Sequence, residues 1–383
     1  MKNIILTFAL LLFTKALFAQ KAANDSVLLD YYQNQHFAEA ADYLKATYPE
    51  PITDLKVLNK LAYTSRMASR LPDANTYYQR VYEADTTNLS SIYNMSEISK
   101  RRGKNKVAIS YIKKILLKDT TNFDVYKQLS DLSYNIGDLQ GNIIYLQKAN
   151  NINPTNPDVA FDLSTYFIKL KQYGNAEQVI DKALAADTAN MLLLQGKAQS
   201  DYALRKYPET VIIAKKLIDA GQQTNAIISM LGTAYYMTND YTNCIKTFKL
   251  LNDNQLGTES SFYYTAMSYK ALHNNVQAII CLDKAIEVGI SSGISSFYSE
   301  KGDSYDRLHQ LDKAVAAYQK SLMYKPDPIT YYALATLYDT GLKNKKSALK
   351  YYKKYLASKK PQDTQKTYIA YSQQRIKSLA TGI

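Results

Sequence analysis

Residues that commonly carry out catalysis or bind metals are scarce in this chain of 383 residues, which has three histidines and two cysteines. His36, His273 and His309 lie far apart and form no HExxH motif or other metal-ligand spacing. The sequence also lacks the phosphate-binding GxGxxG and P-loop motifs and the GxSxG motif of a nucleophilic serine. Carboxylate pairs such as Asp303 and Asp306 are typical of a solvated helix face. The sequence therefore predicts a protein that is not an enzyme and needs no metal or cofactor.

The two cysteines could form a disulfide in an oxidising compartment. Cys244 and Cys281 fall on equivalent helices of neighbouring repeat units described below, but at different heights and on different faces. We therefore expect two buried or half-buried thiols that behave as small hydrophobic side chains, with a disulfide as the alternative.

Lysines are concentrated near the C-terminus, in residues 343–360, where no acidic residue lies between them. Four of these lysines share one face of a predicted helix whose other face is apolar: Lys346, Lys350, Lys353 and Lys354. A solvated helix face is the expected role, and docking on an anionic envelope surface is the alternative.

The organising feature of the chain is a period of 34 residues, marked by a residue that is mostly small. We call the residue that marks each period a stop, and a two-residue expansion within 289–293 shifts the last two stops by two positions. The stops are Ala40, Ala74, Ala108, Asn142, Ala176, Thr210, Cys244, Ala278, Ala314 and Ala348. Self-similarity at a fixed period is the signature of a repeat array.

Each period contains two helical patterns, and we expect two antiparallel helices that approach most closely at paired small residues such as Gly302 and Ala314. Gly103 and Gly137 mark the turn within the unit. The segments between units end in residues expected to cap the next helix: Asn88, Asn122, Asn156 and Asn190.

These units resemble the tetratricopeptide repeat family. The residues that carry the resemblance best are Tyr298, Gly302, Tyr305, Ala314, Tyr318, Ser321 and Pro326. Lys197 and Lys301 depart from the pattern, because they stand where leucine is usual. The resemblance implies an all-α, right-handed superhelical solenoid of about ten helix–turn–helix repeats, with residues 20–360 as the solenoid.

The resemblance also implies that the first helices of successive repeats line a concave groove. Aromatic residues with polar tips would offer large contact areas to a peptide or glycan there, and half-buried packing is the alternative for each. The groove candidates are Tyr63, Tyr93, Tyr134, Phe161, Tyr202, Tyr236, Tyr263 and Tyr332. A lysine–asparagine clamp for acidic C-termini is not supported, since Lys127 is followed four residues later by Asp131.

Both ends of the chain fall outside the repeats. Residues 1–19 are predicted to be a signal peptide cleaved before Gln20, with a buried first helix as the alternative. Cleavage would remove Lys2 and Lys15 and lower the formal net charge from +13 to +11. Residues 361–383 are predicted to form a capping helix, with a detached partner-binding helix as the alternative.

We therefore predict an exported, periplasmic or secreted scaffold that binds a protein or peptide. A module that binds an envelope polysaccharide is the alternative, and an accessory domain of an enzyme complex is a third possibility. No apolar run in the mature chain reaches the roughly 18–20 residues of a membrane span. Export makes nucleic acid an unexpected partner despite the positive charge.

Overall fold

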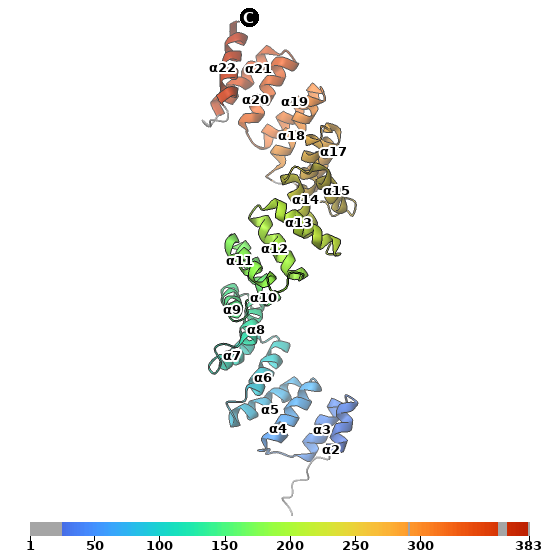
Figure 1. Cartoon of the computed structure of the whole chain (residues 1–383), viewed down its shortest axis with the longest axis vertical. Coiled ribbons are helices and arrows are strands. Elements are labelled where there is room, and N and C mark those ends of the chain that lie inside the picture. Colours follow the sequence, from blue (N-terminus) through green and yellow to red (C-terminus); the bar gives the residue numbers. More distant parts are fainter. Residues whose placement is uncertain (1–24, 290–291, 359–365, 382–383) are drawn as a thin grey trace, which may run out of the picture. The chain divides into compact units, whose positions relative to one another are not determined.

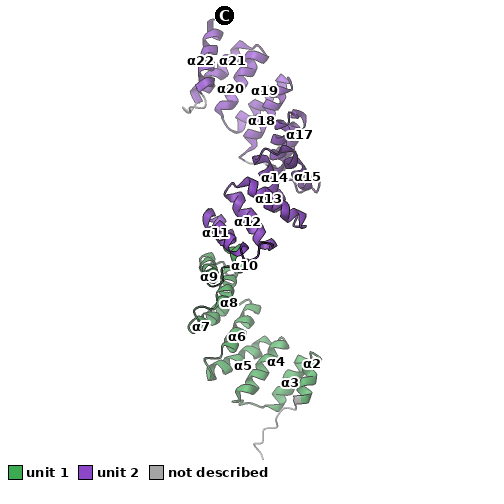
Figure 2. Cartoon of the chain, in the orientation of Figure 1, with its two compact units in different colours: residues 1–163 green, residues 164–383 purple. Residues whose placement is uncertain are grey.

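The structure is a computed structural model, and it describes residues 25–289, 292–358 and 366–381. Its regular elements in these ranges are all helices, without a β-strand, as Figure 1 shows. The predicted all-α fold is therefore confirmed. The chain divides into two compact units, residues 1–163 and residues 164–383, which Figure 2 distinguishes by colour.

The helices pair in sequence order into ten hairpins, in which even-numbered helices come first and odd-numbered helices second. Unit 1 contains α2 (Asp25–Gln33), α3 (Phe37–Thr47), α4 (Leu55–Met67), α5 (Leu71–Ala84), α6 (Leu89–Arg101), α7 (Asn105–Leu116), α8 (Phe123–Asn135) and α9 (Leu139–Ile152). The division between the units falls within α10 (Pro157–Lys169).

Unit 2 continues the same alternation and ends in one additional helix. It contains α11 (Tyr173–Leu184), α12 (Met191–Ala203), α13 (Tyr207–Asp219), α14 (Asn225–Met237), α15 (Tyr241–Asn252), α16 (Glu259–Ala271), α17 (Asn275–Val288), α18 (Ile294–Arg307), α19 (Leu311–Tyr324), α20 (Pro328–Thr336), the π-helical turn η1 (Leu337–Gly341), α21 (Lys345–Ser358) and α22 (Lys366–Thr381).

The turn inside each hairpin contains one residue with left-handed backbone, and this residue repeats with the predicted period. Gly103 and Gly137 have φ angles of 69° and 77°. Eight other residues accept φ between 53° and 62° at the same place, including His273 and His309, which are exposed there. The full series is Gln35, Ser69, Gly103, Gly137, Lys171, Arg205, Asn239, His273, His309 and Lys343.

Close approach of the two helices in a hairpin explains the small residues. A Cβ atom added at Gly302 would lie 2.7 Å from Cδ1 of Tyr318, and one added at Gly232 would lie 2.7 Å from Cε2 of Phe248. Ala74 and Ala314 on the opposing helices are completely buried. The ring of the second helix thus packs against bare backbone of the first at both glycines.

Asn142 is the largest of the polar residues at the small sites, and its amide has a partner. The Asn142 Nδ2 group donates hydrogen bonds to the carbonyl oxygen of Ser130 at 2.9 Å and to its Oγ at 2.7 Å. Ser130 stands at the small site of the first helix of the same hairpin. The hydrogen-bonded pair replaces the apolar contact made in other hairpins.

The predicted caps are also present. The side-chain oxygens of Asn88, Asn122 and Asn156 accept hydrogen bonds from backbone amides three residues later, at 2.9–3.1 Å. Asn190 accepts from the amides of the two residues at 192 and 193. These bonds satisfy amides that the first turn of a helix leaves unpaired.

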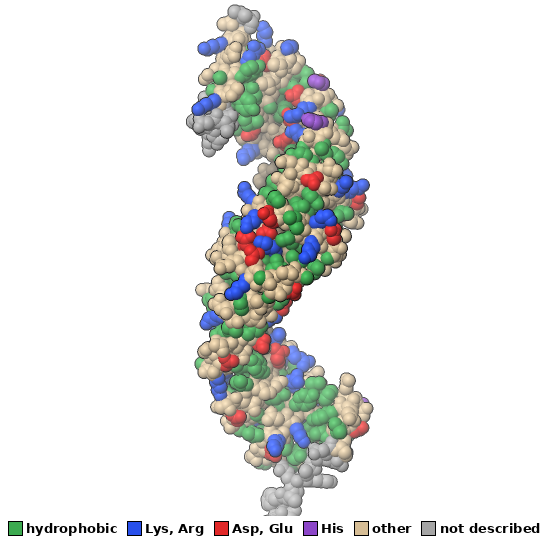
Figure 3. All heavy atoms as spheres, viewed as in Figure 1, with side chains coloured by type: hydrophobic (Ala, Val, Ile, Leu, Met, Phe, Trp, Pro, Cys, Tyr) green, Lys and Arg blue, Asp and Glu red, His purple; other side chains and the backbone are tan. Residues whose placement is uncertain are grey.

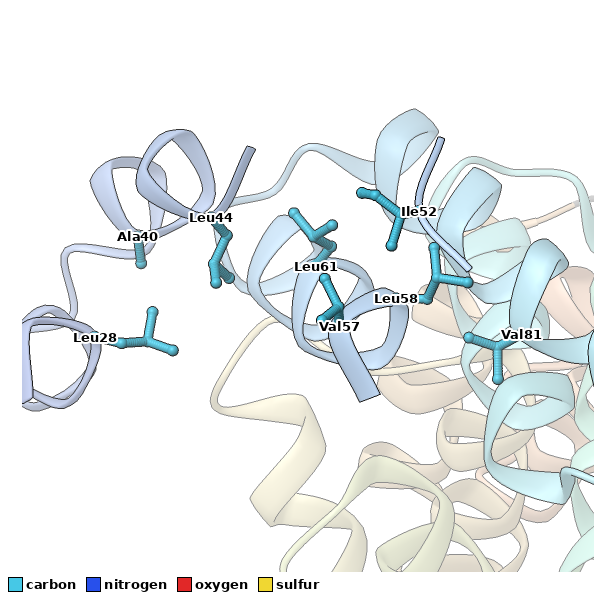
Figure 4. Packing of buried hydrophobic residues seen from close by; sticks show 8 residues of the cluster. All are labelled: Leu28, Ala40, Leu44, Ile52, Val57, Leu58, Leu61 and Val81. Carbon is cyan, nitrogen blue, oxygen red and sulfur yellow. The ribbon is translucent and has the colours of Figure 1, made fainter. Parts of the chain in front are cut away.

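The hydrophobic core runs between neighbouring hairpins, as the packing at the start of unit 1 illustrates (Figure 4). Side chains from α2 to α5 and the connecting segment meet in one cluster: Leu28, Ala40, Leu44, Ile52, Val57, Leu58, Leu61 and Val81. Because each hairpin completes its core with its neighbour, stability is a sum of local and nearest-neighbour contributions.

The two lysines that depart from the family pattern are both paired with carboxylates of the preceding second helix. Lys197 Nζ on α12 lies 2.9 Å from Glu177 Oε1 and 3.0 Å from Asp181 Oδ1 on α11. Lys301 on α18 forms the corresponding pair with Asp283 on α17. Burial would lower the pKa of Lys197, but its hydrogen bonds to carboxylates outweigh burial and raise the pKa. The lysine is charged, and it joins adjacent hairpins.

The last helix, α22, is joined to the final hairpin. Arg375 donates from Nε and Nη2 to the two carboxylate oxygens of Asp339, at 2.7 and 2.8 Å, and the Tyr352 hydroxyl donates to Asp339 at 3.1 Å. Tyr371 and Leu379 pack against the apolar cluster around Tyr352. In residues 366–381 the tail therefore lies against α21.

No helix within the described ranges is long and apolar enough to cross a membrane. The predicted signal peptide, residues 1–19, lies outside these ranges, as do residues 361–365 and 382–383 of the predicted capping segment.

Candidate functional site

First helices form a continuous surface in unit 2. Helices α12, α14 and α16 contact one another directly, whereas the second helices of the same hairpins approach one another less closely. The first helices therefore line the inner side of this stretch. We call the surface formed by the first helices within each unit the first-helix face.

The first-helix face of unit 1 contains a cavity of about 500 Å³ between α6 and α8. Its lining includes the predicted groove residue Tyr93 on α6. The other lining residues come from α8: Asp124, Lys127, Gln128 and Asp131. The cavity thus combines one aromatic ring with both signs of charge.

The lysine in this cavity has an ion-pair partner, whereas the two aspartates have none among the described residues. Lys127 Nζ lies 2.7 Å from Asp158 Oδ2 on α10, so that ammonium is already paired. Burial raises the pKa of Asp131, and burial likewise raises the pKa of Tyr93. Asp124 and Asp131 have no ion pair among the described residues. The cavity therefore has unused hydrogen-bond acceptors beside a partly buried phenol.

The first-helix face of unit 2 brings two of the predicted tyrosines together around a third. Tyr236 of α14 and Tyr263 of α16 both pack against Tyr264, with ring centroids 5.0 and 5.6 Å apart. Tyr263 also contacts Phe297 of α18 at 5.2 Å. Burial raises the pKa of Tyr263 to about 12 and also raises that of Tyr236. Both phenols are neutral at physiological pH and able to donate a hydrogen bond.

Charged residues that were not predicted as site residues lie beside these rings, and among them Asp303, which was expected on a solvated helix face, is ion-paired. Lys270 of α16 is paired with Glu300 of α18 and lies 2.6 Å from Asp303 Oδ2. Arg307 Nε lies 2.9 Å from the same Asp303 oxygen. The sequence did contain a signal for them, because Glu300, Asp303 and Arg307 follow one another at three- and four-residue spacing on one first helix.

The remaining candidates are dispersed. Tyr63 and Tyr134 are exposed, with 41% and 62% of their surface accessible. Phe161 and Tyr202 are half-buried, and Tyr202 lies edge-on to Tyr207 with centroids 6.1 Å apart. The expected groove residues therefore differ in how accessible their rings are.

Tyr332 differs from the other candidates because α22 packs beside it. Its ring lies 4.6 Å from that of Tyr368 and 6.4 Å from that of Tyr371, both on α22. It also contacts Tyr355 at 5.3 Å. Tyr332 thus takes part in attaching the last helix to the final hairpin.

Other reactive groups do not gather into a site. Cys244 and Cys281 are buried free thiols, and burial raises the pKa of Cys244 to about 11. No group of three or more histidine, cysteine, aspartate or glutamate side chains in the described ranges could hold a metal ion.

Comparison with known proteins identifies one repeat directly. Residues 295–328, which contain α18 and α19, match the family model of the tetratricopeptide repeat. No curated protein sequence matches the chain.

Several solved structures are similar in fold. A tetratricopeptide repeat protein from Parabacteroides merdae shares 17% identity, over 64% of this chain and 98% of its own, with a TM-score of 0.43. The C-terminal part of a repeat protein from Cytophaga hutchinsonii shares 17%, over 69% of this chain and 95% of its own, with a TM-score of 0.45. YrrB, described as having an unusual peptide-binding site, shares 18%, over 50% of this chain and 96% of its own, with a TM-score of 0.43. The chain thus contains a match to the tetratricopeptide repeat at residues 295–328, and its other hairpins are two-helix units of the same kind.

Proposed function

We propose that the protein is a non-enzymatic interaction scaffold that binds an extended peptide segment of a partner protein on its first-helix face. The observation that carries this proposal is the cavity between α6 and α8. Its volume of about 500 Å³ suits one or two peptide side chains. The Tyr93 ring supplies apolar contact area, and Asp124, Gln128 and Asp131 supply hydrogen-bond acceptors.

A peptide suits the first-helix face better than a polysaccharide. Sugar rings bind through open aromatic faces. The rings of Tyr236 and Tyr263 instead pack against Tyr264, at interplanar angles of 45° and 59°. Their hydroxyl groups and the charged side chains of Lys270 and Glu300 favour backbone and side-chain hydrogen bonds. On the face visible in Figure 3, basic side chains are interspersed with acidic ones, which does not favour a nucleic-acid partner.

The proposal is tested with peptides selected from a random display library on the full-length mature protein. The affinity of the best peptide is then measured by fluorescence anisotropy. Tyr93→Ala is expected to weaken binding about tenfold or more, because aromatic anchors contribute about 2 kcal/mol or more at interfaces.

Tyr111→Ala on the second helix α7 is the matched control. Tyr111 packs against the same apolar cluster as Tyr93 and is similarly half-buried, but it does not line the cavity. Binding within about twofold of the parent is expected for this variant. Equal losses in both variants, or no loss in Tyr93→Ala, would refute the assignment.

Export is a separate part of the proposal and rests on the sequence of residues 1–19. N-terminal sequencing of the protein purified from a Gram-negative envelope fraction is expected to begin at Gln20. An intact Met1 in that fraction would refute cleavage.

A further inference from the structure

A second cavity, of about 320 Å³, opens between α18 and α19 of unit 2. Its lining consists of two alanines and five longer side chains: Tyr298, Lys301, Tyr305, Lys313 and Lys320. We call it the lysine pocket. At 100° per residue, its residues on α18 lie on the side of the helix opposite Glu300 and Asp303. The lysine pocket is therefore separate from the first-helix face.

Two of the three ammonium groups of the lysine pocket have no carboxylate partner among the described residues. Lys301 is paired with Asp283, but Lys313 and Lys320 have no carboxylate at ion-pair distance within the described ranges. Lys301 and Lys313 both lie over the Tyr305 ring, at 5.7 and 5.6 Å from its centroid. Bringing like charges to one ring is unfavourable, and an anion in the cavity would relieve the repulsion.

Equivalent positions in other hairpins show why the cavity opens here. Lys284 covers the Phe262 ring of its own hairpin at 5.8 Å, and Lys354 covers the Tyr331 ring at 5.5 Å. Each lysine lies on the ring that corresponds to Tyr298.

In the hairpin of α18 and α19 the equivalent lysine is Lys320, and it lies over a different ring. Tyr324 stacks on Tyr298, with centroids 5.8 Å apart and planes 8° from parallel, and Lys320 lies over Tyr324 at 5.7 Å instead. The space that lysine fills elsewhere is left open between α18 and α19. The cavity thus lies in the hairpin where Tyr324, and not the lysine, covers the Tyr298 ring.

We propose that the lysine pocket binds the acidic side chain, glutamate or aspartate, of a peptide segment from a partner protein. The alanines and tyrosine rings contact the methylene stem, while the ammonium groups and the tyrosine hydroxyls donate hydrogen bonds to the carboxylate. An acidic sugar fits less well, since Lys301 and Lys313 lie over Tyr305 and Tyr324 covers a face of Tyr298. This site is additional to the first-helix face and does not depend on it.

The test uses a fluorescein-labelled hexaglutamate peptide, with a hexaglutamine peptide carrying the same label as the control, and the full-length mature protein. We expect saturable binding of the hexaglutamate peptide and no saturable binding of the hexaglutamine peptide. The double variant Lys313→Gln with Lys320→Gln is expected to weaken it about tenfold or more, since hydrogen bonds between charged groups are strong. Circular dichroism melts confirm that the variant is folded.

The matched control removes the same charge from α21, through Lys345→Gln with Lys346→Gln, which lie outside the lysine pocket. Binding within about twofold of the parent is expected. Equal losses in both double variants would show general charge attraction and overturn the site. Absence of saturable hexaglutamate binding would also overturn it. Tighter binding of oligogalacturonate or inorganic phosphate than of hexaglutamate would overturn the assignment to an acidic peptide.

Discussion

The contact between Gly302 and Tyr318 allows a prediction whose sign depends on the neighbouring residue. In Gly302→Ala the new Cβ would lie 2.7–2.9 Å from three ring carbons of Tyr318. Tyr318 is only 3% exposed, so its ring is confined on its other sides. Overpacking of this kind costs about 1–3 kcal/mol. Alanine is more favourable than glycine in a helix by about 1 kcal/mol. We expect net destabilisation of up to about 2 kcal/mol.

A second background isolates the steric effect. Alanine and leucine already face each other in the neighbouring hairpin, as Ala266 and Leu282, and both are buried. In a Tyr318→Leu background, Gly302→Ala is therefore expected to stabilise the protein by about 1 kcal/mol, which reverses its sign.

The double-mutant cycle is measured by urea titration followed by far-ultraviolet circular dichroism. Amide hydrogen exchange of α18 and α19 serves as the local readout, because long repeat arrays do not always unfold in one step. The same effect of Gly302→Ala in both backgrounds would refute the close-contact argument.

Three further predictions concern packing, pH and thiol reactivity. Ala74→Leu and Ala314→Leu should each destabilise by about 1–3 kcal/mol in the same titration, since both sites are completely buried; unchanged midpoints would contradict this. The Arg375 guanidinium lowers the pKa of Asp339 below its ordinary value of 3.8, so anchoring of α22 should be at full strength above that pH and should be lost as pH falls below it. Hydrogen exchange of α22 that does not depend on pH after correction for intrinsic rates would contradict the anchor. Burial raises the pKa of Cys244 from 9.0 to about 11, so at pH 8 its reaction with a disulfide reagent should be at least about a hundredfold slower than after denaturation. Comparable rates before and after denaturation would contradict that burial.

The fold was largely predictable because the same physical requirement recurs in each period. Close helix packing needs a small residue, and a helix start needs a capping side chain, so Ala74 and Asn88 could be placed from sequence alone. The turn was only partly predictable, because glycine marks it at Gly103 and Gly137 while eight residues of other types accept the left-handed backbone.

The candidate site was harder to predict because the exposure of a ring depends on side chains from other helices. Tyr93 lines a cavity, whereas Tyr332 at the equivalent position of its helix packs beside Tyr368 of α22. The lysine pocket was also beyond the sequence pattern, since it lies in the hairpin where Tyr324, and not Lys320, covers the Tyr298 ring. Such differences arise from individual contacts between neighbours and leave no periodic signal.

The two partly buried lysines, Lys197 and Lys301, have a consequence for how this repetitive chain finds its correct neighbours. Most hairpins offer similar apolar sides, which do not distinguish one neighbour from another. Lys197 and Lys301 require an aspartate on the preceding second helix, and that position holds aspartate only before these two lysines, as Asp181 and Asp283. Elsewhere it holds lysine or glutamine: Lys45, Gln79, Lys113, Gln147, Lys215, Lys249 and Gln319.

A skipped or exchanged hairpin would leave Lys301 partly buried without Asp283 and would leave Lys197 with only Asp201 of its own helix, or it would place either ammonium group against another lysine. Loss of one partner of a buried pair costs about 3–5 kcal/mol, and less where the pair is partly exposed, as it is here. Misassembly and domain swapping are characteristic failures of repeat proteins. Two charge pairs thus fix the order of hairpins at two junctions and disfavour the exchange of hairpins between copies of the chain.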